Sequence, residues 1–88
     1  MQDNDIKPAG AARAGTILCV DDEPNILSAL RRLFRSQGYE VLTAQSAREG
    51  LAVLEARPVD VVISDMRMPG MDGVQFLEQA RARWPDTL

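Results

Sequence analysis

Apolar residues in this chain alternate between short continuous runs and longer stretches with helical spacing. The short runs, at 16–20, 39–44 and 60–64, are typical of strands buried in a parallel sheet. Each run is followed by a stretch whose apolar residues recur every three or four positions, which predicts an amphipathic helix. The order β-α-β-α-β-α implies right-handed crossovers and a single parallel sheet, so the predicted fold class is α/β.

Residues suited to a helix's first turn precede each of the three helical stretches. Pro24 follows the acids after the first run, and proline is favoured at the first helical position. Ser46 and Glu49 have the spacing of a capping box, as do Asp72 and Gln75. The apolar stripes expected to face the core are Ile26, Leu27, Leu30, Leu33 and Phe34 in the first helix, Ala47, Leu51 and Leu54 in the second, and Val74, Leu77, Ala80 and Trp84 in the third.

The composition is that of one small globular domain, with 88 residues, 45% of them hydrophobic and 26% charged. The net charge is −3 and no basic stripe with interleaved aromatics is present, so direct nucleic-acid binding is not expected. The chain contains no histidine, which excludes Ser-His and Cys-His catalysis. Its one cysteine, Cys19, cannot form an internal disulfide and is expected in the core.

The first 15 residues are predicted to be a flexible lead-in, ahead of a partial domain at 16–88. They are polar, contain proline and glycine, and lack the apolar centre of a signal peptide. No apolar run in the sequence approaches the roughly 20 residues needed to cross a bilayer. We therefore expect a cytoplasmic protein that makes no membrane contact.

Acidic residues stand where two of the predicted strands end. Asp21 and Asp22 follow the first strand, and Asp65 follows the third. Ligands of open parallel sheets bind at the carboxyl ends of the strands, so these carboxylates should converge if the two strands are neighbours. Three close carboxylates stay ionised only if a cation or hydrogen-bond donors offset their repulsion, and oxygen ligands suit Mg²⁺. The alternative for Asp22 or Glu23 is simple capping of the first helix.

Two motifs carry a family resemblance. The sequence VDDE at 20–23 and the sequence DMRMPGMDG at 65–73 resemble the signature of the two-component response regulator receiver domain. The resemblance extends from residue 16 to residue 88. It implies a flavodoxin-like parallel sheet, here truncated to β-α-β-α-β-α with strand order 2-1-3.

The resemblance also implies a phosphoryl switch. Asp65 matches the aspartate that accepts a phosphoryl group from the phosphohistidine of a sensor histidine kinase or phosphotransfer protein. Asp21, Asp22, Asp65 and the backbone carbonyl of Arg67 match the residues that hold Mg²⁺. The signal then passes to the output domain of a parent protein. The loop-shaping residues of the motif are Met68, Pro69 and Gly73.

The resemblance covers three of the family's five strands. The family's Ser or Thr that moves toward the phosphoryl group, its paired lysine and its aromatic switch residue belong to the part that is not matched. The third strand, with Val61, Val62 and Ile63, would then be an open apolar edge, which invites pairing with another chain. We therefore expect that the chain either self-associates, as a swapped dimer or as a homodimer paired through this edge, or is partly molten.

Three functions are compatible with these sequence features. The first is a phosphoacceptor signalling module, which is not itself an enzyme. The second is a truncated fragment unable to switch, which acts only as a metal-binding or self-associating fold. The third is a phosphatase with an aspartate nucleophile, which would need a second acid close after Asp65, where Arg67 stands.

Overall fold

The computed structural model describes residues 15–65, 70 and 72–88, and within them the predicted alternation of strands and helices is confirmed. The elements are β1 (Gly15–Val20), α1 (Pro24–Arg35), β2 (Tyr39–Ala44), α2 (Ala47–Ala56), β3 (Val61–Ser64) and α3 (Gly73–Arg83). Two strand boundaries differ by one residue from the prediction. Strand β1 starts at Gly15 instead of residue 16, and β3 starts at Val61 instead of residue 60. The rest of the predicted lead-in lies outside the described residues.

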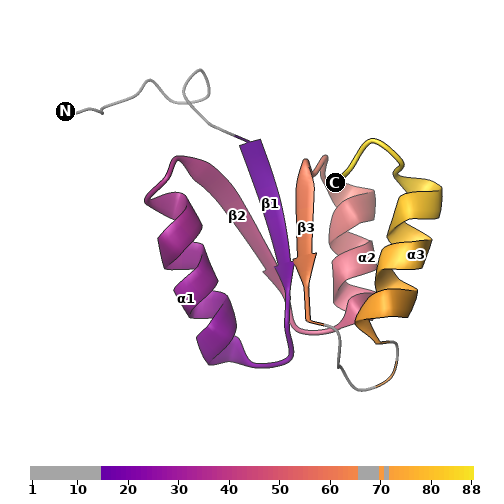
Figure 1. Ribbon diagram of the computed structural model, residues 1–88, viewed down its shortest axis with the longest axis horizontal. Coiled ribbons are helices and arrows are strands. Elements are labelled where there is room, and N and C mark those ends of the chain that lie inside the picture. Colours follow the sequence, from indigo (N-terminus) through magenta and orange to yellow (C-terminus); the bar gives the residue numbers. More distant parts are fainter. Residues whose placement is uncertain (1–14, 66–69, 71) are drawn as a thin grey trace.

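The three strands form a parallel sheet in the order β2-β1-β3, as predicted. Helix α1 lies on one side of this sheet, and α2 and α3 lie on the other (Figure 1). The central strand β1 is the most deeply buried, and Leu18 and Cys19 are completely inaccessible. Among the described residues, no helix has the length and apolar character needed to cross a membrane.

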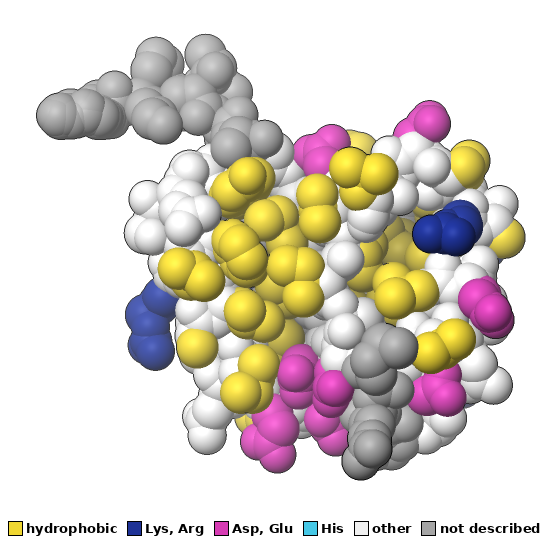
Figure 2. All heavy atoms as spheres, viewed as in Figure 1, with side chains coloured by type: hydrophobic (Ala, Val, Ile, Leu, Met, Phe, Trp, Pro, Cys, Tyr) yellow, Lys and Arg dark blue, Asp and Glu magenta, His cyan; other side chains and the backbone are white. Residues whose placement is uncertain are grey.

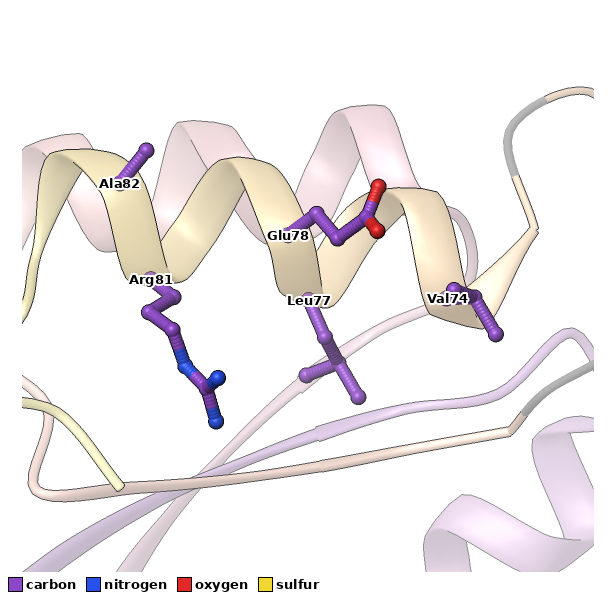
Figure 3. Close-up of a pocket in the computed structure, with 5 residues that line it drawn as sticks. All are labelled: Val74, Leu77, Glu78, Arg81 and Ala82. Atoms are coloured by element: carbon purple, nitrogen blue, oxygen red, sulfur yellow. The ribbon is translucent and has the colours of Figure 1, made fainter.

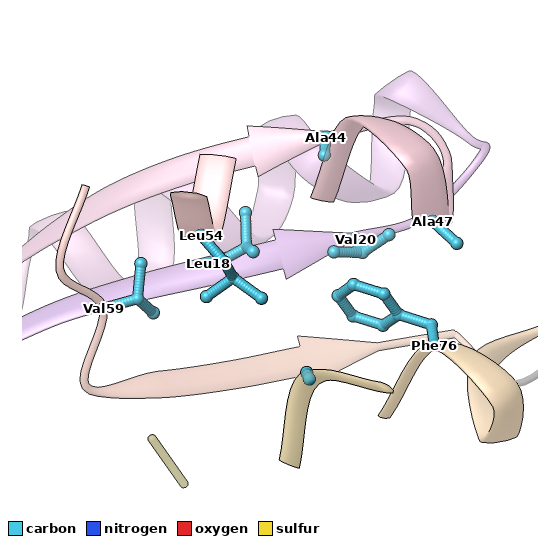
Figure 4. Packing of buried hydrophobic residues seen from close by; sticks show 8 residues of the cluster. Leu18, Val20, Ala44, Ala47, Leu54, Val59 and Phe76 are labelled. Carbon is cyan, nitrogen blue, oxygen red and sulfur yellow. The ribbon is translucent and has the colours of Figure 1, made fainter. Parts of the chain in front are cut away.

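Each face of the sheet has its own apolar cluster, because successive residues of a strand point to opposite faces. Ile17 and Cys19 of β1 pack with Leu27 of α1. Leu18 and Val20 point the other way and pack against α2 and α3, where the Phe76 ring is completely buried (Figure 4). The remaining buried members of this larger cluster are Ala44, Ala47, Leu54, Val59 and Ala80.

The predicted apolar stripe of α3 is partly wrong. Val74 and Leu77 are exposed, and the buried residues are Gly73, Phe76 and Ala80. Both sets have helical spacing, so periodicity alone does not choose between them. The packing of α3 against α2 determines which set is buried, because the Phe76 ring fills the space above Gly50.

The predicted stripe of α1 is also only partly buried. Leu27 is buried and Leu30 and Phe34 are half-buried, whereas Ile26 and Leu33 are 46% and 50% exposed. Within residues 15–65, 70 and 72–88, α1 is the one helix on this face of the three-stranded sheet, and its flanks contact no second helix. Figure 2 shows the resulting apolar surface over α1 and the adjoining strands.

The edge of β3 is less open than the sequence predicted. The Leu88 N–H donates to the Asp60 carbonyl at 2.8 Å, and the Val62 N–H donates to the Leu88 carbonyl at 3.1 Å. The Thr87 hydroxyl donates to the Val59 carbonyl at 2.8 Å. The last residues therefore pair with the start of β3 in the manner of a parallel neighbour and cover that part of its edge.

Replacing Gly50 with alanine tests the contact between α2 and α3. A Cβ at this position would lie 2.9 Å from Cε1 of Phe76 and 3.1 Å from Cγ2 of Val20. Alanine improves helix propensity by about 1 kcal/mol, but overpacking a tight core costs about 1–3 kcal/mol. We expect Gly50→Ala to lower the free energy of unfolding in urea titrations. An increase in stability would show that Phe76 moves aside without cost.

The reactivity of the Cys19 thiol tests whether α1 covers its face of the sheet. Burial raises the pKa of this thiol above its ordinary value of 9.0, because desolvation disfavours the thiolate. We expect Ellman's reagent at pH 8 to react slowly with the native chain and rapidly with the urea-unfolded chain. Equal rates in the two states would mean that the α1 face of the sheet is not packed as described.

Candidate metal centre

Backbone hydrogen bonds extend the parallel ladder one residue past the ends of the strands. The Asp65 N–H donates to the Val20 carbonyl at 2.9 Å, and the Asp21 N–H donates to the Ala44 carbonyl at 3.1 Å. These bonds fix the backbone of Asp65 relative to β1 and that of Asp21 relative to β2. Since β1 lies between β2 and β3, residues that follow β1 and β3 emerge side by side at the same edge of the sheet.

Three carboxylates meet at this edge, as the sequence predicted. Asp21, Asp22 and Asp65 each offer one carboxylate oxygen, and these oxygens all lie within 4.8 Å of one another. Asp21 and Asp65 are half-buried and Asp22 is exposed. In Figure 2, acidic side chains gather at this end of the molecule, where the carboxyl ends of the strands point in Figure 1.

The carboxylates of Asp21 and Asp22 differ in their hydrogen bonding at the start of α1. Oδ1 of Asp21 accepts a hydrogen bond from the Glu23 N–H at 2.9 Å. Glu23 is the N-cap residue but makes no side-chain capping bond, and Pro24 supplies the first helical position. Capping by the side chain of Asp22 or Glu23 is therefore not observed, and the carboxylate beside the helix end is that of Asp21. Within the described residues, Asp22 has no hydrogen-bond or ion-pair partner.

The donor chemistry fits a hard divalent cation. The three side chains offer only carboxylate oxygens, which suit Mg²⁺ with water completing its coordination. One oxygen of Asp21 is already bonded to a backbone N–H, and the N-terminal end of the α1 dipole lies beside it. These donors offset only part of the mutual repulsion, so a cation would stabilise the cluster further.

The loop after β3 is described only in part. Arg67, Met68 and Pro69 lie outside the described residues, so their predicted roles are untested. Gly70 is exposed and has a φ of +81°, a left-handed conformation that favours glycine and fits the predicted turn. Gly73 is buried and begins α3.

The end of this loop is fixed by the predicted capping box at the start of α3. A carboxylate oxygen of Asp72 accepts a hydrogen bond from the Gln75 N–H at 2.9 Å. The side-chain oxygen of Gln75 accepts one from the Asp72 N–H at 3.2 Å. The matching pair at α2 is only half formed, because Glu49 accepts from the Gln45 N–H instead of the Ser46 N–H.

Ser64 has a role at the site that the sequence did not suggest. Its hydroxyl donates to the backbone carbonyl of Asp65 at 3.0 Å. Together with the bond from the Asp65 N–H to Val20, this contact holds both backbone groups of Asp65. The only sequence signal for this contact is a serine directly before the strand-end aspartate.

Comparison with known proteins identifies relatives of this domain. Residues 17–88 match the model of the response regulator receiver domain family. The hydrogenase transcriptional regulatory protein HoxA of Cupriavidus necator is 46% identical over 74 residues, which is 84% of this chain and 15% of HoxA. The sensor protein GacS of Pseudomonas syringae is 37% identical over 78 residues, 89% of this chain and 9% of GacS. The chain thus spans only a small part of these relatives.

Solved structures show the same fold. The response regulator protein TrrA of Thermotoga maritima, in complex with Mg²⁺-BeF, matches with a TM-score of 0.79 and 37% identity. That match covers 83% of this chain and 64% of TrrA. The strand order and helix placement of this chain are therefore those of the receiver domain fold.

Substituting Asp22 with asparagine tests whether the cluster binds a cation. We expect Asp22→Asn to raise the free energy of unfolding in EDTA by a few tenths of a kcal/mol, because it removes one of three mutually repelling charges. Millimolar Mg²⁺ should raise the melting temperature of the unsubstituted chain more than that of the Asp22→Asn variant. Asp86→Asn, in the exposed turn after α3, is the control. An equal Mg²⁺ response in all three chains would exclude a cation at this cluster.

Proposed function

The chain belongs to the response regulator receiver domain family, and we propose that it accepts a phosphoryl group on Asp65 from a phosphohistidine of a partner protein. The observation that supports this most directly is the convergence of Asp21, Asp22 and Asp65, whose carboxylate oxygens lie within 4.8 Å of one another. The cluster follows β1 and β3, at the sheet edge where open parallel sheets bind ligands.

Asp65 is the proposed nucleophile. A carboxylate oxygen of Asp65 attacks phosphorus, the phosphorus–nitrogen bond breaks, and its electron pair stays on the imidazole of the donor, which takes up a proton. The product is an aspartyl phosphate on this chain. The backbone of Asp65 is held by Val20 and by the Ser64 hydroxyl, so the attacking group is positioned before the donor arrives.

Asp22 and Asp65 are the proposed direct carboxylate ligands of Mg²⁺, with Asp21 acting largely through water. The exposed carboxylate of Asp22 is available for ligation, whereas Oδ1 of Asp21 is held by the Glu23 N–H. When bound, Mg²⁺ would offset the charge of the phosphoryl oxygens and align them for transfer. The Mg²⁺-BeF complex of TrrA supports this choice of metal. The backbone carbonyl of Arg67 is the remaining proposed protein ligand.

The proposed partners follow from the same chemistry. The donor is a sensor histidine kinase or phosphotransfer protein, and the receiver of the signal is an output domain of the parent protein. A relative named as a transcriptional regulatory protein supports the output domain, and a relative named as a sensor protein supports the kinase partner. We place the protein in the cytoplasm, where transcriptional regulators act, with no direct contact to nucleic acid or membrane. On this proposal the chain is a substrate of its kinase and not an enzyme with a substrate of its own.

A second candidate function is a fold that only binds metal or self-associates and cannot switch. The exposed apolar side chains of Ile26, Leu33 and Val74 favour self-association. A homodimer through the edge of β3 was the expected form, although Leu88 already pairs with the beginning of that edge.

Phosphorylation distinguishes the two functions. We expect incubation with Mg²⁺ and acetyl phosphate to add one phosphoryl group, detected by mass spectrometry of the intact chain. Asp65→Asn should remove the adduct and Asp86→Asn should retain it, because only Asp65 carries the nucleophile. EDTA should also abolish it.

Two results would contradict the proposal. Full incorporation in Asp65→Asn would exclude Asp65 as the acceptor. No adduct on the parent chain, under conditions in which a complete receiver domain is modified, would favour the second function.

A further inference from the structure

The free edge of β2 lies on the opposite side of the sheet from the last residue of the chain. In the order β2-β1-β3, β1 is the one strand among the described residues that pairs with β2. Leu88 pairs with β3. The hollow on the outer face of α3 (Figure 3) borders that side of the sheet, because Leu77 lines both this hollow and a groove that Leu88 lines. The surface around β2 is therefore separated from Leu88 by β1 and β3.

Three residues of β2 direct their backbone groups away from β1. The Ala44 carbonyl accepts a hydrogen bond from the Asp21 N–H, so the backbone groups of Ala44 point toward β1. These groups alternate between the two sides of a strand, so those of Tyr39, Val41 and Thr43 point outward to the free edge. A strand added at this edge would bond to these three residues.

A groove with two arginines runs along this edge, on the α1 side of the sheet. It has a volume of about 390 Å³ and lies between the C-terminal half of α1 and the first half of β2. The ring of Tyr39 is held there by an edge-to-face contact with Phe34, with 6.0 Å between the ring centroids. The lining residues are Arg31, Arg35, Gly38, Tyr39, Glu40 and Val41.

The two arginines of this groove have unused hydrogen-bond donors. Nη2 of Arg31 donates to Oγ1 of Thr43 at 3.1 Å, which uses one of its five N–H groups. Within the part of the chain that the structure describes, Arg35 has no ion-pair partner. The acid in the groove, Glu40, accepts a hydrogen bond from Arg57 at 2.6 Å, and α1 itself contains no acidic residue. The groove is therefore complementary to carboxylates.

We propose that the β2 edge binds an extended acidic segment of a partner protein, which pairs with β2 as an additional strand. Arg31 and Arg35 are four residues apart in α1, or about 6 Å along the helix axis. Side chains at positions i and i+2 of an extended strand lie on one face, about 6.6 Å apart. Two acidic residues at alternate positions would therefore reach both arginines, while backbone bonds to Val41 and Thr43 hold the segment in place.

A second copy of this chain fits the same edge poorly. Pairing of two β2 edges would bring Arg31 and Arg35 of each copy toward the same arginines of the other, and like charges oppose that approach. The one acid that β2 offers, Glu40, is bonded to Arg57. Charged side chains beside an edge strand commonly prevent edge-to-edge association of identical chains. Here the same charges favour an acidic partner.

Titration with a synthetic peptide tests this proposal. The probe is a threonine-rich peptide with blocked ends and two aspartates at alternate positions, and NMR spectroscopy follows the amides of the full, isotope-labelled chain. We expect saturable shifts and slower hydrogen exchange at the amides of Val41 and Thr43. The Leu42 amide should keep its exchange rate, because it points toward β1. Arg31→Glu and Arg35→Glu should each weaken binding by about threefold or more.

Matched controls make the outcome specific. The same peptide with asparagine in place of both aspartates should bind more weakly by about threefold or more. Arg48→Glu changes the net charge as much as Arg35→Glu does, but lies on α2, on the other side of the sheet, and should leave the affinity unchanged. Asp65→Asn should also leave it unchanged, which separates this proposal from the phosphoacceptor proposal. Far-UV circular dichroism checks that each variant is folded.

Three results of this titration would overturn the proposal. The first is the absence of saturable shifts at millimolar peptide. The second is equal weakening by Arg48→Glu and Arg35→Glu, which would indicate a general effect of net charge. The third is binding without slower exchange at Val41 and Thr43, which would exclude strand addition.

The chain's own acids provide one more comparison. Asp3 and Asp5 also stand at alternate positions, in the part of the sequence outside the described residues. We expect the full chain with Asp3→Asn and Asp5→Asn to bind the peptide as the unsubstituted chain does. Binding by this variant alone would overturn the proposal, because the first residues of the chain would then be the occupant of the edge.

Discussion

The parallel pairing of β1 with β3 is the constraint on which the rest of the molecule depends. Its register sets Ile17 beside Val61 and Val20 beside Ser64, and it continues through the bond from the Asp65 N–H to Val20. Side chains alternate along a strand, so a slip of one residue would turn the apolar side chains of β3 to the wrong faces. The same slip would move Asp65 away from Asp21 and Asp22. The pairing that builds the core therefore also builds the carboxylate cluster.

The two faces of the sheet are covered unequally, and the larger buried cluster lies on the face covered by α2 and α3. On one face, α2 and α3 enclose Leu18, Val20 and Phe76, with Gly50 allowing the ring to approach. On the other, α1 is the only helix among the described residues, and Ile26 and Leu33 of its apolar stripe are exposed. Ile26 and Leu33 of α1 and Val74 and Leu77 of α3 are the large apolar side chains left exposed on the two helices.

The clustered aspartates and the arginines lie in different parts of the molecule. The three aspartates gather at the carboxyl ends of the strands, where a cation can bridge them. Among the described arginines, Arg57 pairs with Glu40 of β2 and Arg83 pairs with Glu55 of α2, whereas Arg81 lies on an exposed face of α3. A phosphoryl group approaching Asp65 therefore meets carboxylates first, which is why the proposed transfer requires Mg²⁺.

The sequence by itself determined the element order, the capping box at Asp72 and the convergence of three aspartates, because local periodicity and strand-end position carry that information. It did not determine which of two helical stripes of α3 is buried, since Val74 and Phe76 both lie on apolar stripes with helical spacing. It also did not reveal that Leu88 pairs with β3, that Ser64 holds Asp65, or that Asp21 receives the Glu23 N–H. The buried face of α3 and the pairing of Leu88 depend on contacts between segments whose relative positions local patterns do not specify. The bonds of Ser64 and Asp21 are local in sequence, but they depend on the backbone conformation at the ends of β3 and β1, which only the tertiary structure fixes.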